Sequence, residues 1–234
     1  MTMLPTRLPT PIPMPNPILP TATSGLSSAT RLATCALLVL LSGCSLLSKP
    51  KDPVTVYSLD PRVQAEPSWP TVPWQLSMTT PSASRMDDSA RITVRPTPNE
   101  VEVYKGATWA KRPSEMLGDA VLRTLEDSGR IAAVARQGSG IGGDYKLVLD
   151  IRRFESDYAG QAVPAATIEV NAKLLHGQDP QVVLSRTFLQ AQPATGIAVP
   201  DVVAAFDRAM TSVTADIAGW VLVEGDRHQR GAHK

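Results

Sequence analysis

Cys44 is the residue whose type and setting point most directly to chemistry, because its thiol ends the sequence Leu41-Ser42-Gly43-Cys44. Arg31 and an apolar run of about ten residues precede it, and these are the parts of a secretory signal peptide. The run is too short to span a bilayer, which takes about 20 apolar residues. The pattern looks like a bacterial lipobox, in which the thiol receives a diacylglyceryl group before cleavage on its amino side. We predict that Cys44 is the lipid attachment site; the alternative is a short buried helix with an incidental cysteine.

The same processing predicts a location. Ser45, rather than an aspartate, follows Cys44. Under the usual bacterial sorting rule this implies an outer-membrane protein, anchored through acyl chains such as palmitate and facing the periplasm. Cleavage before Cys44 removes Cys35, so the mature chain is expected to hold no free thiol and no disulfide.

The remaining residues offer little for catalysis. A nucleophilic hydrolase needs a base, and the histidines are His176 in a predicted hairpin loop and His228 and His233 in a polar tail. No G-x-S-x-G turn is present in the sequence to hold a nucleophilic serine. A zinc site needs clustered cysteine or histidine, which the mature sequence lacks. We therefore predict that the protein is not an enzyme and holds no metal.

Two further patterns have plain structural interpretations. The segment Gly138–Gly143 has the G-x-G-x-x-G spacing of a dinucleotide site, but the residues after it alternate as a strand, whereas that site requires a helix. It is predicted to be a flexible connection, so no cofactor is expected. Asp150, Glu155 and Asp157 lie on or beside one predicted strand, where a solvated sheet face explains them better than acid and base pairing.

Charge excludes another class of function. The chain has 23 basic and 22 acidic side chains and a formal charge of +1. Nucleic-acid-binding domains carry a strongly basic surface. Binding to DNA or RNA is therefore not expected.

The domain boundaries follow from composition. Residues 1–43 form a Pro-rich extension and signal peptide, and residues 44–53 form the lipidated anchor and linker. Residues 54–223 are predicted to form a single domain interrupted by a Pro-rich insert at residues 62–73, and residues 224–234 to form a polar, frayed tail.

Residues of alternating polarity predict most of the strands. Strands are expected at residues 54–59, 74–78, 91–95 and 100–104, the last two joined as a hairpin, and a shorter one at residues 131–136. Three longer runs with short links, at residues 144–154, 167–175 and 182–190, predict an antiparallel meander.

Apolar residues at three- and four-residue spacing predict two helices. One begins near Pro113, with Ser114 as its cap, and ends at Gly129. The other begins at Pro200 and carries an apolar stripe that includes Phe206 and Trp220. The stripes must be buried, so the fold class is predicted to be α+β, an antiparallel sheet with two amphipathic helices packed on it.

A set of short features recurs in order between Tyr57 and Trp220. Together they resemble the ABC-type transport auxiliary lipoproteins, a family that includes paraquat-inducible protein C. The Pro-rich insert and the N-terminal extension do not belong to that pattern. After Cys44, the features are Tyr57-Ser58-Leu59, residues 91–95, residues 103–109, residues 126–130, Asp144-Tyr145, Phe154, Ala205-Phe206 and Trp220.

The resemblance implies a non-enzymatic lipoprotein that works with an MCE (mammalian cell entry) protein, a permease and an ATPase to move lipids or other hydrophobic molecules across the envelope. Tyr104 and Trp109 are the candidate partner contacts, because both lie around a stretch with Gly106 that is expected to be a loop, and because tyrosine and tryptophan are enriched at binding hot spots. The alternative for Trp109 is that it packs the segment onto the first helix.

Other outcomes are left open by the sequence. The chain could form a homo-oligomer. It could instead be a stand-alone periplasmic lipid-binding module, or a structural envelope lipoprotein that needs no transporter.

Overall fold

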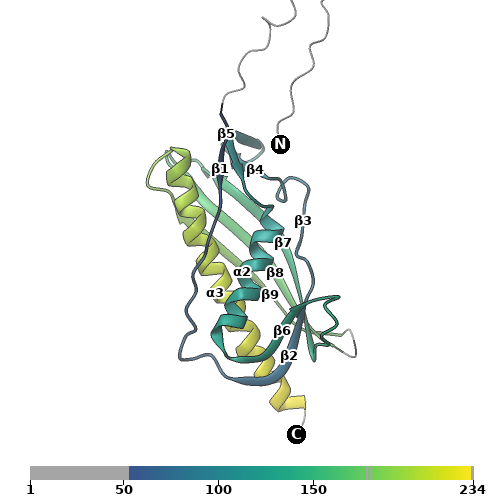
Figure 1. Cartoon of the computed structure of the whole chain (residues 1–234). Coiled ribbons are helices and arrows are strands. Elements are labelled where there is room, and N and C mark those ends of the chain that lie inside the picture. The colour runs from purple at the N-terminus through teal and green to yellow at the C-terminus, as the bar shows by residue number, and fades with distance from the viewer. Residues whose placement is uncertain (1–52, 178, 180, 233–234) are drawn as a thin grey trace, which may run out of the picture. The chain divides into compact units, whose positions relative to one another are not determined.

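A computed structural model describes residues 53–177, 179 and 181–232 (Figure 1). The predicted signal peptide and Cys44 lie outside the described residues. The strands are β1 (Thr55–Tyr57), β2 (Val72–Met78), β3 (Ser82–Ala83), β4 (Arg91–Arg95), β5 (Glu102–Trp109), β6 (Ile131–Arg136), β7 (Tyr145–Asp157), β8 (Ala165–His176) and β9 (Val182–Pro193), and the helices are α2 (Pro113–Ser128) and α3 (Val199–Ala232).

The sheet is organised around β7, whose residues Tyr145, Leu147, Leu149 and Ile151 alternate with more exposed ones and are buried. The predicted meander is confirmed, because β7 pairs antiparallel with β8 and β8 with β9. Along its other edge β7 meets three strands in succession, β2, β3 and β4. One long strand therefore holds both halves of the nine-stranded sheet together.

The sheet is mixed, so the prediction of a purely antiparallel sheet is wrong. β2, β3 and β4 all run parallel to β7, β1 runs parallel to β5, and β2 runs parallel to β6. Parallel neighbours need a long connection between them, and the chain that joins the parallel pair β2 and β6 includes β3, β4, β5 and α2. Alternating polarity identifies a strand but does not indicate which strand lies beside it or in which direction that strand runs.

Both helices lie on the same side of the sheet, as Figure 1 shows. α2 begins with Pro113 and ends at Gly129, whose positive φ of 60° suits a glycine at a helix end. Ser114 does not cap the helix as predicted; its backbone N–H instead donates to Asp88 Oδ1 at 3.0 Å. The segments that precede α2 therefore help to fix where it begins.

α3 is longer than the sequence predicts. The tail expected to fray after Val223 continues the helix to Ala232. Tyr145 on β7 holds the last turns of α3 in place, because its hydroxyl lies 2.9 Å from His228 Nδ1 and donates to Gln229 Oε1 at 3.1 Å. The polar composition of the tail gives no sign of this buried partner. No helix in the described part of the chain is long and apolar enough to cross a membrane.

The segment between β1 and β2, residues 58–71, forms a strap across the helices and contains most of the Pro-rich insert. Asp60 connects it to both helices: its N–H donates to Asp207 Oδ1 at 3.2 Å, and its carboxylate lies 3.7 Å from the Arg123 guanidinium. Leu59 and Trp69 are only 6% and 4% exposed. The insert is therefore part of the packed domain.

Candidate functional site

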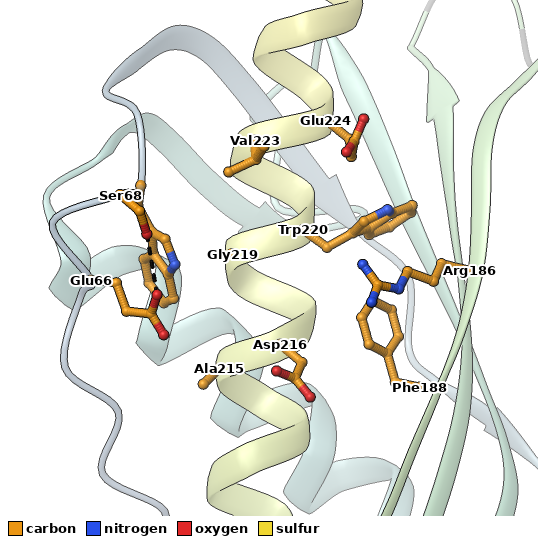
Figure 2. Close-up of a pocket in the computed structure, with 11 residues that line it drawn as sticks. Glu66, Ser68, Arg186, Phe188, Ala215, Asp216, Gly219, Trp220, Val223 and Glu224 are labelled. Atoms are coloured by element: carbon orange, nitrogen blue, oxygen red, sulfur yellow. Dashed lines mark hydrogen bonds between the residues drawn. The ribbon is translucent and has the colours of Figure 1, made fainter.

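A shallow groove of about 260 Å³ lies over α3 around Gly219. We call it the α3 groove. Figure 2 shows Glu66 and Ser68 of the strap on one side of the helix and Arg186 and Phe188 of β9 on the other. The residues that line the α3 groove are Glu66, Ser68, Trp69, Arg186, Phe188, Ala215, Asp216, Gly219, Trp220, Val223 and Glu224.

The strap side of the groove depends on one glycine. A Cβ on Gly219 would stand 2.6 Å from Nε1 of Trp69, so only glycine lets the indole lie this close to the helix. Trp69 is buried, at 4% exposed, so the strap is packed tightly against α3 on this side of the groove.

The opposite side of the groove is formed by two aromatic side chains and one arginine that contact one another. The rings of Phe188 and Trp220 meet edge to face with their centroids 5.8 Å apart, and the Arg186 guanidinium lies 5.0 Å from the centre of the Phe188 ring. Such a contact between a cation and an aromatic face is favourable. The alternation of β9 brings both residues to the helix side of the sheet, although Arg186 is a charged residue between the apolar Leu184 and Phe188.

Acidic side chains outnumber basic ones around the groove. Glu66 and Asp216 have neutral hydrogen-bond donors, Ser68 at 3.2 Å and Gln190 at 2.8 Å. Glu224 is paired with Arg227. Two of the three carboxylates therefore form no salt bridge with a cationic side chain among the described residues.

Trp109 lies in the core rather than at a surface. Its side chain is 3% exposed and meets Phe154 of β7 and Phe206 of α3 edge to face, with ring centroids 6.0 and 5.2 Å apart. This placement matches the packing alternative, although its partners are β7 and α3 rather than the first helix. The segment that contains Trp109 was expected to be a loop and is strand β5.

Tyr104 is half-buried, and its hydroxyl lies 3.0 Å from the Ser156 hydroxyl. Burial raises the pKa of Tyr104, against the hydrogen bond from Ser156, which lowers it. Tyr104 and Trp109 thus have different surroundings, and Tyr104 is the one that keeps some exposed surface.

Glu155 differs from the solvated carboxylate that the sequence suggested. It is 1% exposed and is held by Arg95, whose Nε lies 3.0 Å from Oε2, and by Arg153, whose Nε lies 2.8 Å from Oε1. Arg153 also pairs with Asp157 at 2.5 Å. Both carboxylate oxygens of Glu155 are thus held by guanidinium groups, and this network of ion pairs joins β4 to β7.

Histidines that the sequence places far apart meet at the opposite end of β7. The His176 and His228 rings lie 6.5 Å apart, and each is 5.8 Å from the ring of Tyr145. Burial raises the pKa of Tyr145. Among the described residues no group of three or more histidine, cysteine, aspartate or glutamate side chains is arranged to hold a metal.

Comparison with known families identifies the chain. The family model of the ABC-type transport auxiliary lipoprotein component matches residues 57–218. The chain belongs to this family. The matched region includes the strap, the α3 groove up to Ala218 and the aromatic core around Trp109. The resemblance drawn from the sequence is thereby confirmed.

Solved structures agree with the family assignment. The chain is 53% identical to a protein of the DUF330 family from Xanthomonas campestris, with a TM-score of 0.72, over 75% of this chain and 99% of that one. An uncharacterised protein that is 15% identical, with a TM-score of 0.55 over 71% of this chain and 97% of that one, shares the fold. No curated protein matches the chain.

Sequence reasoning did not find the α3 groove. Its parts come from the strap, from β9 and from the outer face of α3, three segments far apart in the chain. The available signal was the apolar run Ile217–Val223, which leaves no polar side for a helix that faces water.

Proposed function

We propose that this protein is the non-catalytic auxiliary lipoprotein of an MCE-type ABC transport system for lipids or other hydrophobic molecules. The observation that carries the proposal is the family match over residues 57–218. In this proposal Cys44 carries the lipid anchor, the outer membrane holds the anchor, and the folded domain faces the periplasm. An MCE protein with its permease and ATPase is the partner.

The α3 groove is the surface that we assign to the partner. Trp69 and Trp220 lie in the walls of the groove but are only 4% and 8% exposed, so they shape the groove, and the charged side chains around them are the groups that meet the partner. Glu66 and Asp216 lack cationic partners among the described residues, so a partner segment with lysine or arginine fits the charge. Trp109 is buried away from partners, and Tyr104 is kept as a second, smaller candidate contact.

Binding of the MCE protein encoded beside this chain tests the partner. The soluble domain from Pro50 onward is titrated with that protein, and the wild type is expected to bind. Absence of binding by the folded wild type would contradict the partnership. Lipid that co-purifies with a domain unable to bind the MCE protein would support the stand-alone lipid-binding module instead.

Two substitutions on one helix test the groove. Ala215→Arg fills the α3 groove with a bulky cation, whereas Ala204→Arg adds the same side chain to α3 outside it, at an exposed position. We expect Ala215→Arg to weaken binding at least about tenfold, equivalent to about 1.4 kcal/mol, and Ala204→Arg to leave it unchanged. Equal affinities for both variants would move the contact elsewhere, with Tyr104→Ala as the next variant to compare.

A further inference from the structure

Exposed aliphatic side chains gather at one end of the domain. Val101, Val163 and Ile197 lie on three separate loops and are 37%, 38% and 64% exposed. They belong to the β4–β5 turn, the β7–β8 turn and the loop from β9 to α3. The nine large hydrophobic side chains that are exposed in the described part of the chain are Val54, Val56, Met86, Val101, Ile141, Val163, Val182, Leu189 and Ile197.

Strand pairing brings these three loops to the same end. The Tyr158 N–H, at the start of the β7–β8 turn, donates to the Arg95 carbonyl at the end of β4 at 3.1 Å. The Ala194 N–H, at the end of β9, donates to the Pro164 carbonyl at 2.9 Å. Figure 1 shows the first turn of α3 at this end, beside β4 and β5. The loops therefore form one continuous end face.

The end face carries little charge. Residues 158–164 and residues 194–198 contain no charged side chain, and Glu100 is the charged residue of the β4–β5 turn between residues 96 and 101. Behind the turns, Arg153 neutralises Asp157 and Arg95 neutralises Glu155. Exposed aliphatic side chains without surrounding charge favour contact with an apolar or interfacial phase.

A hollow beside this end adds apolar surface with basic residues at its edge. Met86, Val101 and Val103 line a depression of about 620 Å³, together with Arg85, Arg91 and one acidic residue, Glu102. Met86 is 52% exposed. Aliphatic side chains with arginine beside them suit a lipid surface, where the apolar groups enter the acyl boundary and the guanidinium groups meet phosphates.

The predicted anchor restricts which surface can reach the bilayer. β1 begins the described domain near the same end: Thr55 pairs with Ala107, and Val54 and Val56 beside it are 59% and 61% exposed. From Cys44 to Pro53 the chain can extend at most ~30 Å. An anchored domain is thus held with this end within a short distance of the membrane.

We propose that this end face is a membrane-docking surface that rests in the headgroup region of the same bilayer that holds the lipid anchor. The inference rests on the lipid anchor of the proposed function. Three aliphatic loop tips bind a bilayer weakly by themselves, but the anchor supplies a high local concentration, so weak contacts suffice to orient the domain. Docking through this end leaves the α3 groove free for the partner.

Single cysteines test the surface in the full lipidated chain, because the mature sequence holds no cysteine other than Cys44. Val101→Cys and Ile197→Cys label two loop tips, and Val182→Cys labels an aliphatic position of similar exposure, 54%, at the start of β9. Each variant carries a polarity-sensitive fluorophore and is placed in vesicles of phosphatidylethanolamine and phosphatidylglycerol with brominated acyl chains.

We expect the bromolipids to quench the labels at residues 101 and 197 at least about twofold, with a blue shift, and to leave the label at residue 182 unchanged. Equal quenching at all three positions, or none at residues 101 and 197 in a chain whose mass shows the lipid, would overturn the docking surface and leave the lipoprotein assignment intact. If the labels at residues 101 and 197 show a blue shift only after the MCE protein is added, the end face would be reassigned to that partner. A chain recovered without lipid would contradict both proposals.

Discussion

Gly219→Ala is the substitution whose effect follows most directly from the packing of the strap. Within a helix, alanine is more favourable than glycine by about 1 kcal/mol. The new methyl group, however, would stand 2.6 Å from Trp69 Nε1, and Trp69 is 4% exposed. Forcing an extra carbon into a packed site costs about 1–3 kcal/mol, so we expect a net loss of up to about 2 kcal/mol in the free energy of unfolding.

The same helix offers a matched control. A Cβ on Gly231 would meet nothing within 4 Å, so Gly231→Ala adds the methyl group without the clash; because residue 231 lies in the last turn of α3, its propensity gain is smaller than that at residue 219. In a chain that also carries Trp69→Ala, the obstacle at Gly219 is removed, and Gly219→Ala is expected to become stabilising by up to about 1 kcal/mol. The reversal of sign would be a coupling of about 1–3 kcal/mol between the two residues.

Denaturant unfolding of the wild type, the two glycine variants, Trp69→Ala and the double variant measures all of these quantities. Equal stabilisation by Gly219→Ala and Gly231→Ala would refute the reasoning, since the strap would then not lie against α3. A loss at Gly219 that persists in the Trp69→Ala background would also refute it, because another neighbour would have to cause the clash.

Three further predictions concern the core, a salt bridge and the end of α3. Trp109→Ala is expected to cost about 3–5 kcal/mol because it leaves a cavity beside the stacked rings of Phe154 and Phe206. Tyr104→Phe loses one hydrogen bond and about 1 kcal/mol, so equal melting temperatures for the two variants would contradict the buried position of Trp109. Burial opposes ionisation of Asp119, but Lys111 at 2.6 Å and Arg136 outweigh it and lower the pKa, so Asp119→Asn should cost about 0.5–1 kcal/mol above about pH 4. That difference should disappear as the pH falls through the lowered pKa, and a difference independent of pH would argue against the pairing. Tyr145→Phe removes the hydroxyl that contacts His228 and Gln229, so amide hydrogen exchange after Val223 should become faster while exchange near the start of α3 is unchanged.

Local patterns in the sequence were enough to predict most elements. Period-two alternation identified β7 and β8, and Pro113 and Gly129 marked the two ends of α2, because these signals depend on neighbours in the chain. The same patterns carry no information about which strands pair or in which direction they run. They could not predict that β2, β3 and β4 run parallel to β7, so the sheet was wrongly predicted to be purely antiparallel.

The wrong predictions for individual site residues have the same physical cause as the wrong strand directions. Trp109 was assigned to a loop because Gly106 interrupts the pattern, yet the strand continues and turns the indole toward Phe206. Glu155 was assigned to solvent because its partner Arg95 comes from β4. Trp69 belongs to the Pro-rich insert that was expected to interrupt the domain, but Gly219 of α3 provides the space that lets it pack in the core. Each error concerns a contact between segments distant in the chain.

The assignment as an auxiliary component of a transport system is tested most directly by purifying the tagged full-length protein from its native membranes and identifying what comes with it. We expect recovery of the MCE protein with its permease and ATPase, in amounts that Ala215→Arg reduces and Ala204→Arg does not. Recovery of the lipidated protein without any of the three components would contradict its assignment to an MCE-type transport system.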